Sequence, residues 1–289
     1  DVYKRQILKR TKDLEDLEKE IAELDEILKS KARIKTIIVK ELKSIAEKYG
    51  QPRKSIIIYD DVARYEEETV EIPDYPVNLF FTKEGYFKKI TPQSLRMSGE
   101  QKLKDGDEII QELEFTNNCD LLFFTDKCQV YKAKADDFAQ TKASVLGDYV
   151  AAKLGFDEGE NAVKMVATKD YKGMLLFAFE NGKAAKVPLE SYATKTNRKK
   201  LTGAYSDKSP LVGLLYMPED EEVLFKASSG NMLLVHTGAL ALKTTRSTQG
   251  VAVLKPKKGH RLFSIERYKD GTFTNPKRYR TGSLPARGA

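Results

Sequence analysis

Four times along this chain, an apolar run is followed by a tight turn and a second apolar run. The copies begin at Leu79, Leu121, Leu175 and Val223, and a spacing of roughly 42–54 residues is typical of propeller blades. Three of the turns contain Glu-Gly, Asn-Gly or Ser-Gly, in which glycine supplies the positive φ of a two-residue turn. Each copy therefore predicts a β-hairpin.

Further apolar runs lie between the hairpins and begin at Ile109, Ala162, Leu211 and Leu262. Each repeat then has about four strands, as a propeller blade requires. A β-unit of this size cannot bury its apolar face alone, so it has to stack on its neighbours in a ring or an arc. We therefore expect a mainly β fold with an N-terminal α-helical segment. Residues 75–275 would form a propeller-like domain of about four four-stranded repeats.

Two helices are predicted before the repeats, over residues 11–29 and 33–49. Their apolar residues lie three and four positions apart, the spacing of a coiled-coil seam or a helical hairpin. Gly50 suits a left-handed helix C-cap, and Pro52 cannot continue a helix. Each apolar stripe needs a partner, which is the other helix, an upstream helix or a second copy of the chain. The stripes comprise Leu14, Leu17, Ile21, Leu24 and Leu28, then Ile34, Ile38, Leu42, Ile45 and Tyr49.

Residues 55–74 are expected to link the helices, which end by residue 54, to the repeats. Residues 55–59 suit a short strand, and residues 59–74 carry seven acidic side chains and one arginine. Residues 276–289 are basic and contain Gly and Pro, so we expect a flexible tail. The chain opens within a helical pattern, so we expect it to be a fragment of a longer protein.

The net charge of +7 is unevenly distributed. Residues 183–289 hold 20 basic and 8 acidic side chains, a net charge of +12. The positive electrostatic field of this segment favours a polyanion as partner, and nucleic acid is the commonest polyanion. The alternative is an ordinary solvated surface rich in lysine.

Clusters of Lys and Arg are the candidate DNA contacts, because neutralising phosphates releases counterions and needs no base reading. The aromatic residues of the hairpins lie at strand positions, so we expect them in the core and not in a base-stacking platform. The candidate contacts are Lys88, Lys89, Lys102, Lys104, Lys195, Arg198, Lys199, Lys200, Lys243, Arg246, Lys255, Lys257, Lys258 and Arg261.

Several classes of protein are disfavoured. No run approaches the ~20 apolar residues of a membrane span, and the first residues lack the apolar core of a secretory signal. Cys119 and Cys128 do not make a disulfide framework, so we expect reduced cysteines in a cytosolic protein. With only His236 and His260 beside them, no metal site is expected. Phosphate-loop and nucleophile-elbow motifs are missing, so we expect neither a catalytic residue nor a cofactor here.

Two segments carry a resemblance to a known family. Residues 41–54, ELKSIAEKYGQPRK, resemble the end of the coiled-coil tower in the A subunit of bacterial type IIA topoisomerases, DNA gyrase and topoisomerase IV. Residues 244–251, TTRSTQGV, are similar to a passage that recurs in the C-terminal β-pinwheel of these proteins, a propeller-like disc with strand exchange between blades. The resemblance covers roughly residues 7–279.

The resemblance implies a role in changing DNA topology. The complete enzyme cleaves a duplex through a catalytic tyrosine, passes a second duplex and uses ATP and Mg²⁺ bound elsewhere. None of the tyrosines of this chain is expected to be the catalytic one. The implied partners are double-stranded DNA, a second A subunit through the tower and the ATPase B subunit, in the bacterial cytoplasm at the nucleoid. The implied role of this segment is to bind and bend DNA.

Two departures from the gyrase pattern favour a protein of the topoisomerase IV kind or a hybrid of the two. The gyrase box Gln-Arg-Arg-Gly-Gly-Lys/Arg-Gly has its nearest counterpart in residues 195–203, which keep a basic run but lose the Gly-Gly pair. Four repeats are recognisable where a gyrase pinwheel has six. Two other functions stay open: a propeller scaffold that binds proteins and oligomerises through its helices, and an enzyme with its site in the central channel.

Overall fold

The computed structural model describes residues 2–51, 72–194 and 198–289. The chain divides into two compact units, with the boundary between Thr69 and Val70. The strand expected at 55–59 and most of the acidic segment lie outside the described residues, as does Lys195. No described helix is long and apolar enough to cross a membrane.

The first unit consists of helices α1 (Val2–Lys29) and α2 (Lys31–Tyr49), which confirms the predicted helices. Ser30 separates them and caps α2, because its Oγ accepts a hydrogen bond from the Arg33 N–H at 3.4 Å. Neither helix buries a residue. The two apolar stripes are therefore exposed along the chain, and a packed hairpin is not observed.

The prediction for Gly50 was wrong in detail. Its φ is −60°, an ordinary value, and not the positive value of a left-handed cap. Its N–H donates to the Ala46 carbonyl at 2.7 Å, and a Cβ here would lie 2.1 Å from that oxygen. Glycine is needed because the backbone approaches closely.

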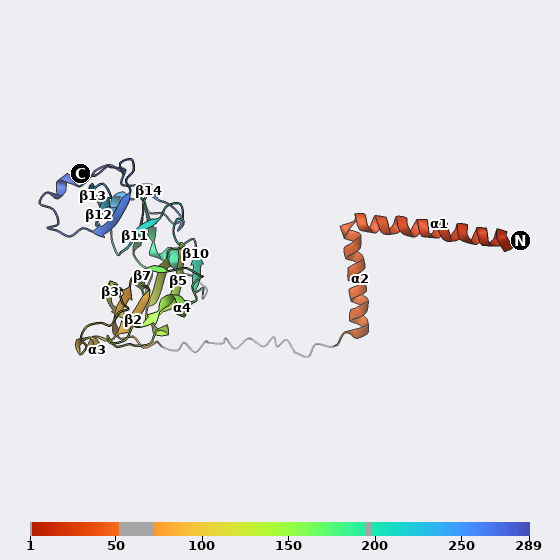
Figure 1. Ribbon diagram of the computed structural model, residues 1–289, viewed down its shortest axis with the longest axis horizontal. Coiled ribbons are helices and arrows are strands. Elements are labelled where there is room, and N and C mark those ends of the chain that lie inside the picture. Colours follow the sequence, from red (N-terminus) through yellow and green to blue (C-terminus); the bar gives the residue numbers. More distant parts are fainter. Residues whose placement is uncertain (1, 52–71, 195–197) are drawn as a thin grey trace. The chain divides into compact units, whose positions relative to one another are not determined.

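The second unit is built of four antiparallel blades, which Figure 1 shows in chain order from yellow to blue. The first three have four strands and the last has three. Short helices α3 (Pro92–Arg96) and α4 (Val150–Leu154) lie in the connections. From inside to outside, the strands are: blade 1, β3 (Ile109–Thr116), β1 (Pro76–Thr82), β2 (Tyr86–Ile90) and β6 (Asp148–Tyr149); blade 2, β7 (Ala162–Thr168), β4 (Asp120–Thr125), β5 (Gln129–Lys134) and β10 (Lys200–Thr202); blade 3, β11 (Leu211–Met217), β8 (Met174–Phe179), β9 (Lys183–Pro188) and β14 (Val251–Ala252); blade 4, β15 (Leu262–Arg267), β12 (Glu222–Ala227) and β13 (Met232–His236).

Each outer strand reaches its blade from further along the chain. Strand β6 follows β5 of blade 2 but pairs with β2 of blade 1, and β10 and β14 repeat this exchange one and two blades later. The inner strands β3, β7, β11 and β15 all line one axial cavity. This arrangement confirms the propeller-like fold with strand exchange.

The segment 276–289 was expected to be a flexible tail, but it lies against blade 4. The backbones of Ala289 and Met232 exchange two hydrogen bonds of 2.9 Å. The Arg280 guanidinium donates to both carboxylate oxygens of Glu222, at 2.6 and 2.7 Å. Through these contacts Ala289 pairs with β13 in the same way as β14 pairs with β9.

Burial between blades explains the continuous apolar runs. In β4, Leu121 and Phe123 pack against blade 1, whereas Leu122 and Phe124 pack against blade 3. Successive side chains of a strand point to opposite faces, and both faces of this strand are covered by a neighbouring blade. A strand buried on both sides has no polar alternation. The same holds for β8, whose alternate residues join the clusters toward blades 2 and 4.

The hairpin turns follow the glycine prediction. Gly85, Gly182 and Gly230 have φ values of 85°, 79° and 85°, and Cys128 takes φ 56° at the fourth turn. Their surroundings differ, since a Cβ on Gly182 would lie 2.0 Å from the Leu254 carbonyl oxygen and a Cβ on Gly230 would meet nothing within 4 Å. The outer strand thus passes close to the Gly182 turn.

We expect Gly182→Ala to destabilise the protein more than Gly230→Ala does. Both substitutions force a side chain into a left-handed backbone, at a cost of about 1–2 kcal/mol. Only Gly182→Ala also displaces backbone of the outer strand, which adds about 1–3 kcal/mol, as for overpacking. Urea denaturation of the two variants measures the difference. Equal losses would contradict the close approach of residue 254.

Candidate nucleic-acid interface

Two kinds of loop recur on every blade. The outer-rim loops lead to the outer edge of each blade, and their described residues are 139–147, 193–194 with 198–199, 241–250 and 280–288. The turn-edge loops lie beside the hairpin turns and are residues 99–108, 155–161, 204–210 and 255–261. Backbone hydrogen bonds anchor both kinds: Lys243 N–H donates to the Lys186 carbonyl at 2.8 Å, and Ser228 N–H donates to the Arg261 carbonyl at 2.9 Å.

The outer-rim loop of blade 2 and the start of β10 carry three of the predicted contacts. Arg198 and Lys199 are exposed, and Lys200 is half-buried. The Lys200 Nζ lies 2.7 Å from Asp157 Oδ2, and this hydrogen bond lowers the pKa of the Asp157 carboxyl. Arg198 and Lys199 also border a hollow of about 440 Å³ whose lining includes Lys132 and Lys134. The lining also includes Asp137 and Asp120, which pairs with Lys134 at 3.2 Å. Arg198 and Lys199 are therefore the cations here that a phosphate would meet.

The outer-rim loop of blade 3 carries Lys243 and Arg246, and both are half-exposed. They lie further from the outer strand than Arg198 and Lys199 do, because Val251 of β14 corresponds to Leu201 of β10. Arg246 is held in place, because its Nη1 donates to the Ser191 carbonyl at 3.3 Å and its guanidinium lies 5.8 Å from the Tyr192 ring centre. A pre-ordered guanidinium loses less rotamer entropy when it binds a phosphate. Blades 2 and 3 therefore both present cations on their outer-rim loops.

The turn-edge loop of blade 4 is the most basic of its kind. Lys255, Lys257 and Lys258 are exposed, and no carboxylate of the described residues lies within 4.0 Å of their ammonium groups. Arg261 is 3.3 Å from Glu180, a carboxylate at the hairpin turn of blade 3. His260 lies beside Ser228 Oγ at 3.3 Å. It occupies a turn, as the sequence indicated.

Lys88 and Lys89 were predicted as DNA contacts, but the structure buries both, with exposed fractions of 1% and 2%. The Lys88 Nζ donates to the Lys102 carbonyl at 2.6 Å. The Lys89 Nζ donates to Asn117 Oδ1 and the Ala135 carbonyl, at 2.6 and 2.7 Å. Burial lowers the pKa of each ammonium group. Neither side chain reaches the surface where a phosphate would bind.

Lys89 belongs to a structural set of lysines. It faces Leu79 across its hairpin, as Lys132 faces Leu122 and Lys186 faces Leu176. Each side chain reaches the next blade. Lys186 Nζ contacts Asp220 Oδ1 and the Thr237 carbonyl, both at 2.9 Å, and Lys132 Nζ lies 4.9 Å from the Tyr171 ring centre. These lysines tie successive blades together.

Lys102 and Lys104 are exposed, but they lie on the least basic blade. The Lys104 Nζ is 3.4 Å from Glu84, and the same loop contains Asp105, Asp107 and Glu108. A phosphate at this loop would meet more carboxylates than ammonium groups. The predicted contacts therefore separate into an exposed basic group on blades 2–4 and a weaker pair on blade 1.

Besides Arg280, which pairs with Glu222, two exposed cations in outer-rim loops were not among the predicted contacts, Lys142 in blade 1 and Arg287 in blade 4. Gly147 and Gly250 precede the outer strands β6 and β14, and Gly288 precedes Ala289, which pairs with β13. Their φ values are 88°, 70° and 76°, and each lies against a carbonyl of the neighbouring strand. Aligning the repeats on these glycines would have placed both cations on the rim.

We expect Lys89→Met to change the stability of the fold and Lys257→Met to change DNA binding. The first takes the lysine donor from the Asn117 side chain and one of two donors from the Ala135 carbonyl, so it should destabilise the fold by about 1–3 kcal/mol and leave the salt dependence of DNA binding unchanged. The second should change stability by less than about 0.5 kcal/mol and lower the slope of log K against log salt by about 1. Urea denaturation and fluorescence anisotropy with duplex DNA measure both. A reduced slope for Lys89→Met would restore it as a contact.

Known proteins resemble this chain both in sequence and in fold. No family model matches the chain. It is 28% identical over 276 residues to the DNA gyrase A subunit of Streptomyces coelicolor, which covers 90% of this chain and 32% of that protein. It is 25% identical over 277 residues to the DNA gyrase A subunit of Metamycoplasma arthritidis, with 92% and 31% covered. The chain thus spans about a third of the length of these relatives.

Two solved structures share the fold of the β-unit. The C-terminal domain of DNA topoisomerase IV aligns with a TM-score of 0.59 and 24% identity, over 68% of this chain and 62% of that domain. The E. coli ParC C-terminal domain aligns with a TM-score of 0.51 and 15% identity, over 66% and 78%. The chain is therefore a homologue of DNA gyrase A subunits, and its second unit is a β-pinwheel of the kind found in the C-terminal domains of these topoisomerases.

Proposed function

We propose that this chain is the DNA-binding part of the A subunit of a type IIA topoisomerase, and that it binds and bends duplex DNA. The observation that supports this most is the repetition of exposed cations on equivalent loops. Arg198 and Lys199 on blade 2 and Lys243 and Arg246 on blade 3 lie on equivalent outer-rim loops, at different distances from the outer strand. Strand exchange fixes the rotation from one blade to the next, so the cations follow an arc.

An arc of cations is what bending requires. Bending 20–30 base pairs by 40–90° costs on the order of 1–6 kcal/mol, so several phosphate contacts along the curve have to offset that cost. One cluster would bind a straight duplex equally well. Cations on three successive blades can contact phosphates only along a curved path.

The contacts are with the DNA backbone and not with bases. The large aromatic side chains of the hairpins, including Phe80, Phe123, Phe177 and Phe225, are buried in the blade cores. They leave no stacking platform for unpaired bases. Affinity would then come from counterion release, with DNA deformability as the source of any sequence preference.

In the complete enzyme, this pinwheel would present a duplex for strand passage and so act on supercoiling or decatenation. The ATPase B subunit, ATP, Mg²⁺ and the catalytic tyrosine would act elsewhere. The exposed stripes of α1 and α2 suit pairing with the same helices of a second A subunit in the enzyme. Activity of the topoisomerase IV kind fits the outer-rim loop of blade 2, which lacks a Gly-Gly pair.

The alternative is a scaffold for protein partners, which the same exposed helical stripes would also serve. The two functions differ in their response to salt. Phosphate contacts weaken steeply as salt rises, whereas apolar protein contacts do not.

The rim contacts can be tested with two variants of equal charge. In the rim variant, Arg198, Lys199, Lys243 and Arg246 become Gln. In the control variant, Lys83, Lys153, Lys169 and Lys172 become Gln, each of which already pairs with a carboxylate. We expect the rim variant to lose about 3–4 from the salt slope of DNA binding, and the control to lose much less. Equal losses would show that net charge, and not the rim, determines binding.

A further inference from the structure

One position of the inner strands differs among the junctions between blades. Gln111, Lys164 and Gly213 are equivalent, because they pair with Phe81, Phe124 and Ala178 one step before the bulge in each blade. Each of these residues faces the next blade around the axis. The three junctions are nevertheless filled in three ways.

Two of the junctions are complete. Between blades 1 and 2, the Gln111 amide donates to the Met165 carbonyl at 2.8 Å and accepts from the Met165 N–H at 2.7 Å. Between blades 3 and 4, Ile265 fills the space over Gly213, since a Cβ there would lie 2.5 Å from Ile265 Cγ1. At both junctions, the residue at this position therefore has no polar side-chain group that lacks a partner.

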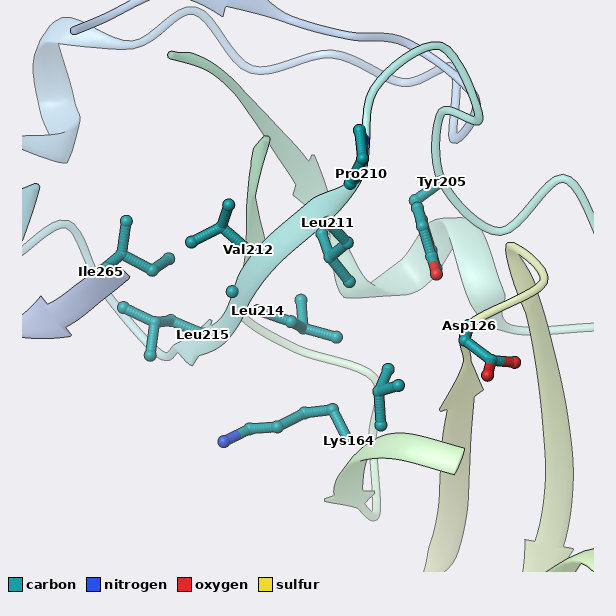
Figure 2. A pocket seen from close by; sticks show the side chains of 11 residues that line it. Asp126, Lys164, Tyr205, Pro210, Leu211, Val212, Leu214, Leu215 and Ile265 are labelled. Carbon is teal, nitrogen blue, oxygen red and sulfur yellow. The ribbon is translucent and has the colours of Figure 1, made fainter. Parts of the chain in front are cut away.

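The junction between blades 2 and 3 is different. Lys164 faces a cavity of about 470 Å³, and no hydrogen bond or ion pair joins its ammonium group to any of the described residues. The wall opposite is apolar and consists of Leu211, Val212, Leu214, Leu215 and Ile265. Figure 2 shows the Lys164 side chain extended beneath Leu215, with Asp126 at the far end of the cavity.

The other polar groups of the cavity already have partners. The Asp126 carboxylate accepts from the Asn161 backbone and side-chain amides, both at 3.0 Å. The Tyr205 hydroxyl donates to the Thr125 carbonyl at 2.5 Å. Among the described residues that line this cavity, the Lys164 ammonium group is thus the one that is left to bind a ligand.

The local field favours an anion. An adjoining cavity of about 270 Å³ also borders Lys164 and Leu215, and it contains Arg267. Burial lowers the pKa of Lys164, and the charge of Arg267 lowers it further. Arg267 already pairs with Glu221 at 3.0 Å. Lys164 has no such partner among the described residues, so beside apolar walls it carries a desolvation cost that a bound anion would offset.

We propose that this axial cavity is a binding site for a small carboxylate with an apolar chain. The carboxylate would pair with the Lys164 ammonium, and the chain would lie along β11 toward Ile265. The volume is within the range of about 300–1,000 Å³ that small-molecule pockets occupy. The site is separate from the basic loops and does not depend on DNA binding.

The experiment compares octanoate with 1-octanol by isothermal titration calorimetry on the full chain. We expect octanoate to bind in a 1:1 ratio and at least about tenfold more tightly than octanol, the range of one charge-assisted hydrogen bond. Lys164→Met should reduce octanoate affinity to that of octanol. Lys164→Arg should retain the preference, and Lys169→Met, an exposed lysine just after β7, should change nothing.

Three results would overturn the proposal: no octanoate binding, equal affinity for octanoate and octanol, or full octanoate affinity in Lys164→Met. Thermal unfolding shows whether each variant is folded. The comparison of the two ligands on the unsubstituted chain decides the proposal even if Lys164→Met fails to fold.

Discussion

Burial of apolar side chains between neighbouring blades is the constraint on which the β-unit depends. Blades 2 and 3 place alternate residues of β4 and β8 into two different cores, and blades 1 and 4 each share one of these cores, so no blade is complete without its neighbours. At about 25 cal/mol per Å² of apolar surface, such burial is the main favourable term. Strand exchange adds backbone hydrogen bonds to the same junctions and fixes the rotation between blades.

Lysine has two roles in this fold. At the position of Lys89, Lys132 and Lys186, a long side chain crosses a junction between blades and ends on a carbonyl, a carboxylate or an aromatic ring of the next blade. On the outer-rim and turn-edge loops, the same residue type is exposed. A buried lysine that donates to fixed acceptors specifies one rotation between blades. An exposed lysine only adds to the positive electrostatic potential at the surface.

The sequence was sufficient for the repeat, the hairpins and the three hairpin turns that contain glycine, because turn chemistry and apolar runs are local signals. It could not separate Lys88 and Lys89 from Lys257, since burial is decided by loops far along the chain, such as the one that contains Ala135. The docking of residues 276–289 on blade 4 also went unrecognised. It depends on backbone hydrogen bonds to β13, and backbone pairing between distant segments leaves no pattern in the sequence. The outer-rim cations Lys142 and Arg287 needed an alignment of the repeats by backbone geometry.

Function follows from the same geometry. If equivalent loops are held at fixed rotations about the axis, their exposed cations can contact DNA phosphates only when the duplex curves.

The most direct measurement is energy transfer between the ends of a duplex of about 40 base pairs as this chain is added at several salt concentrations. The account predicts salt-sensitive binding accompanied by a rise in energy transfer, which reports shortening of the end-to-end distance. Salt-sensitive binding to a duplex whose ends do not approach one another would contradict it.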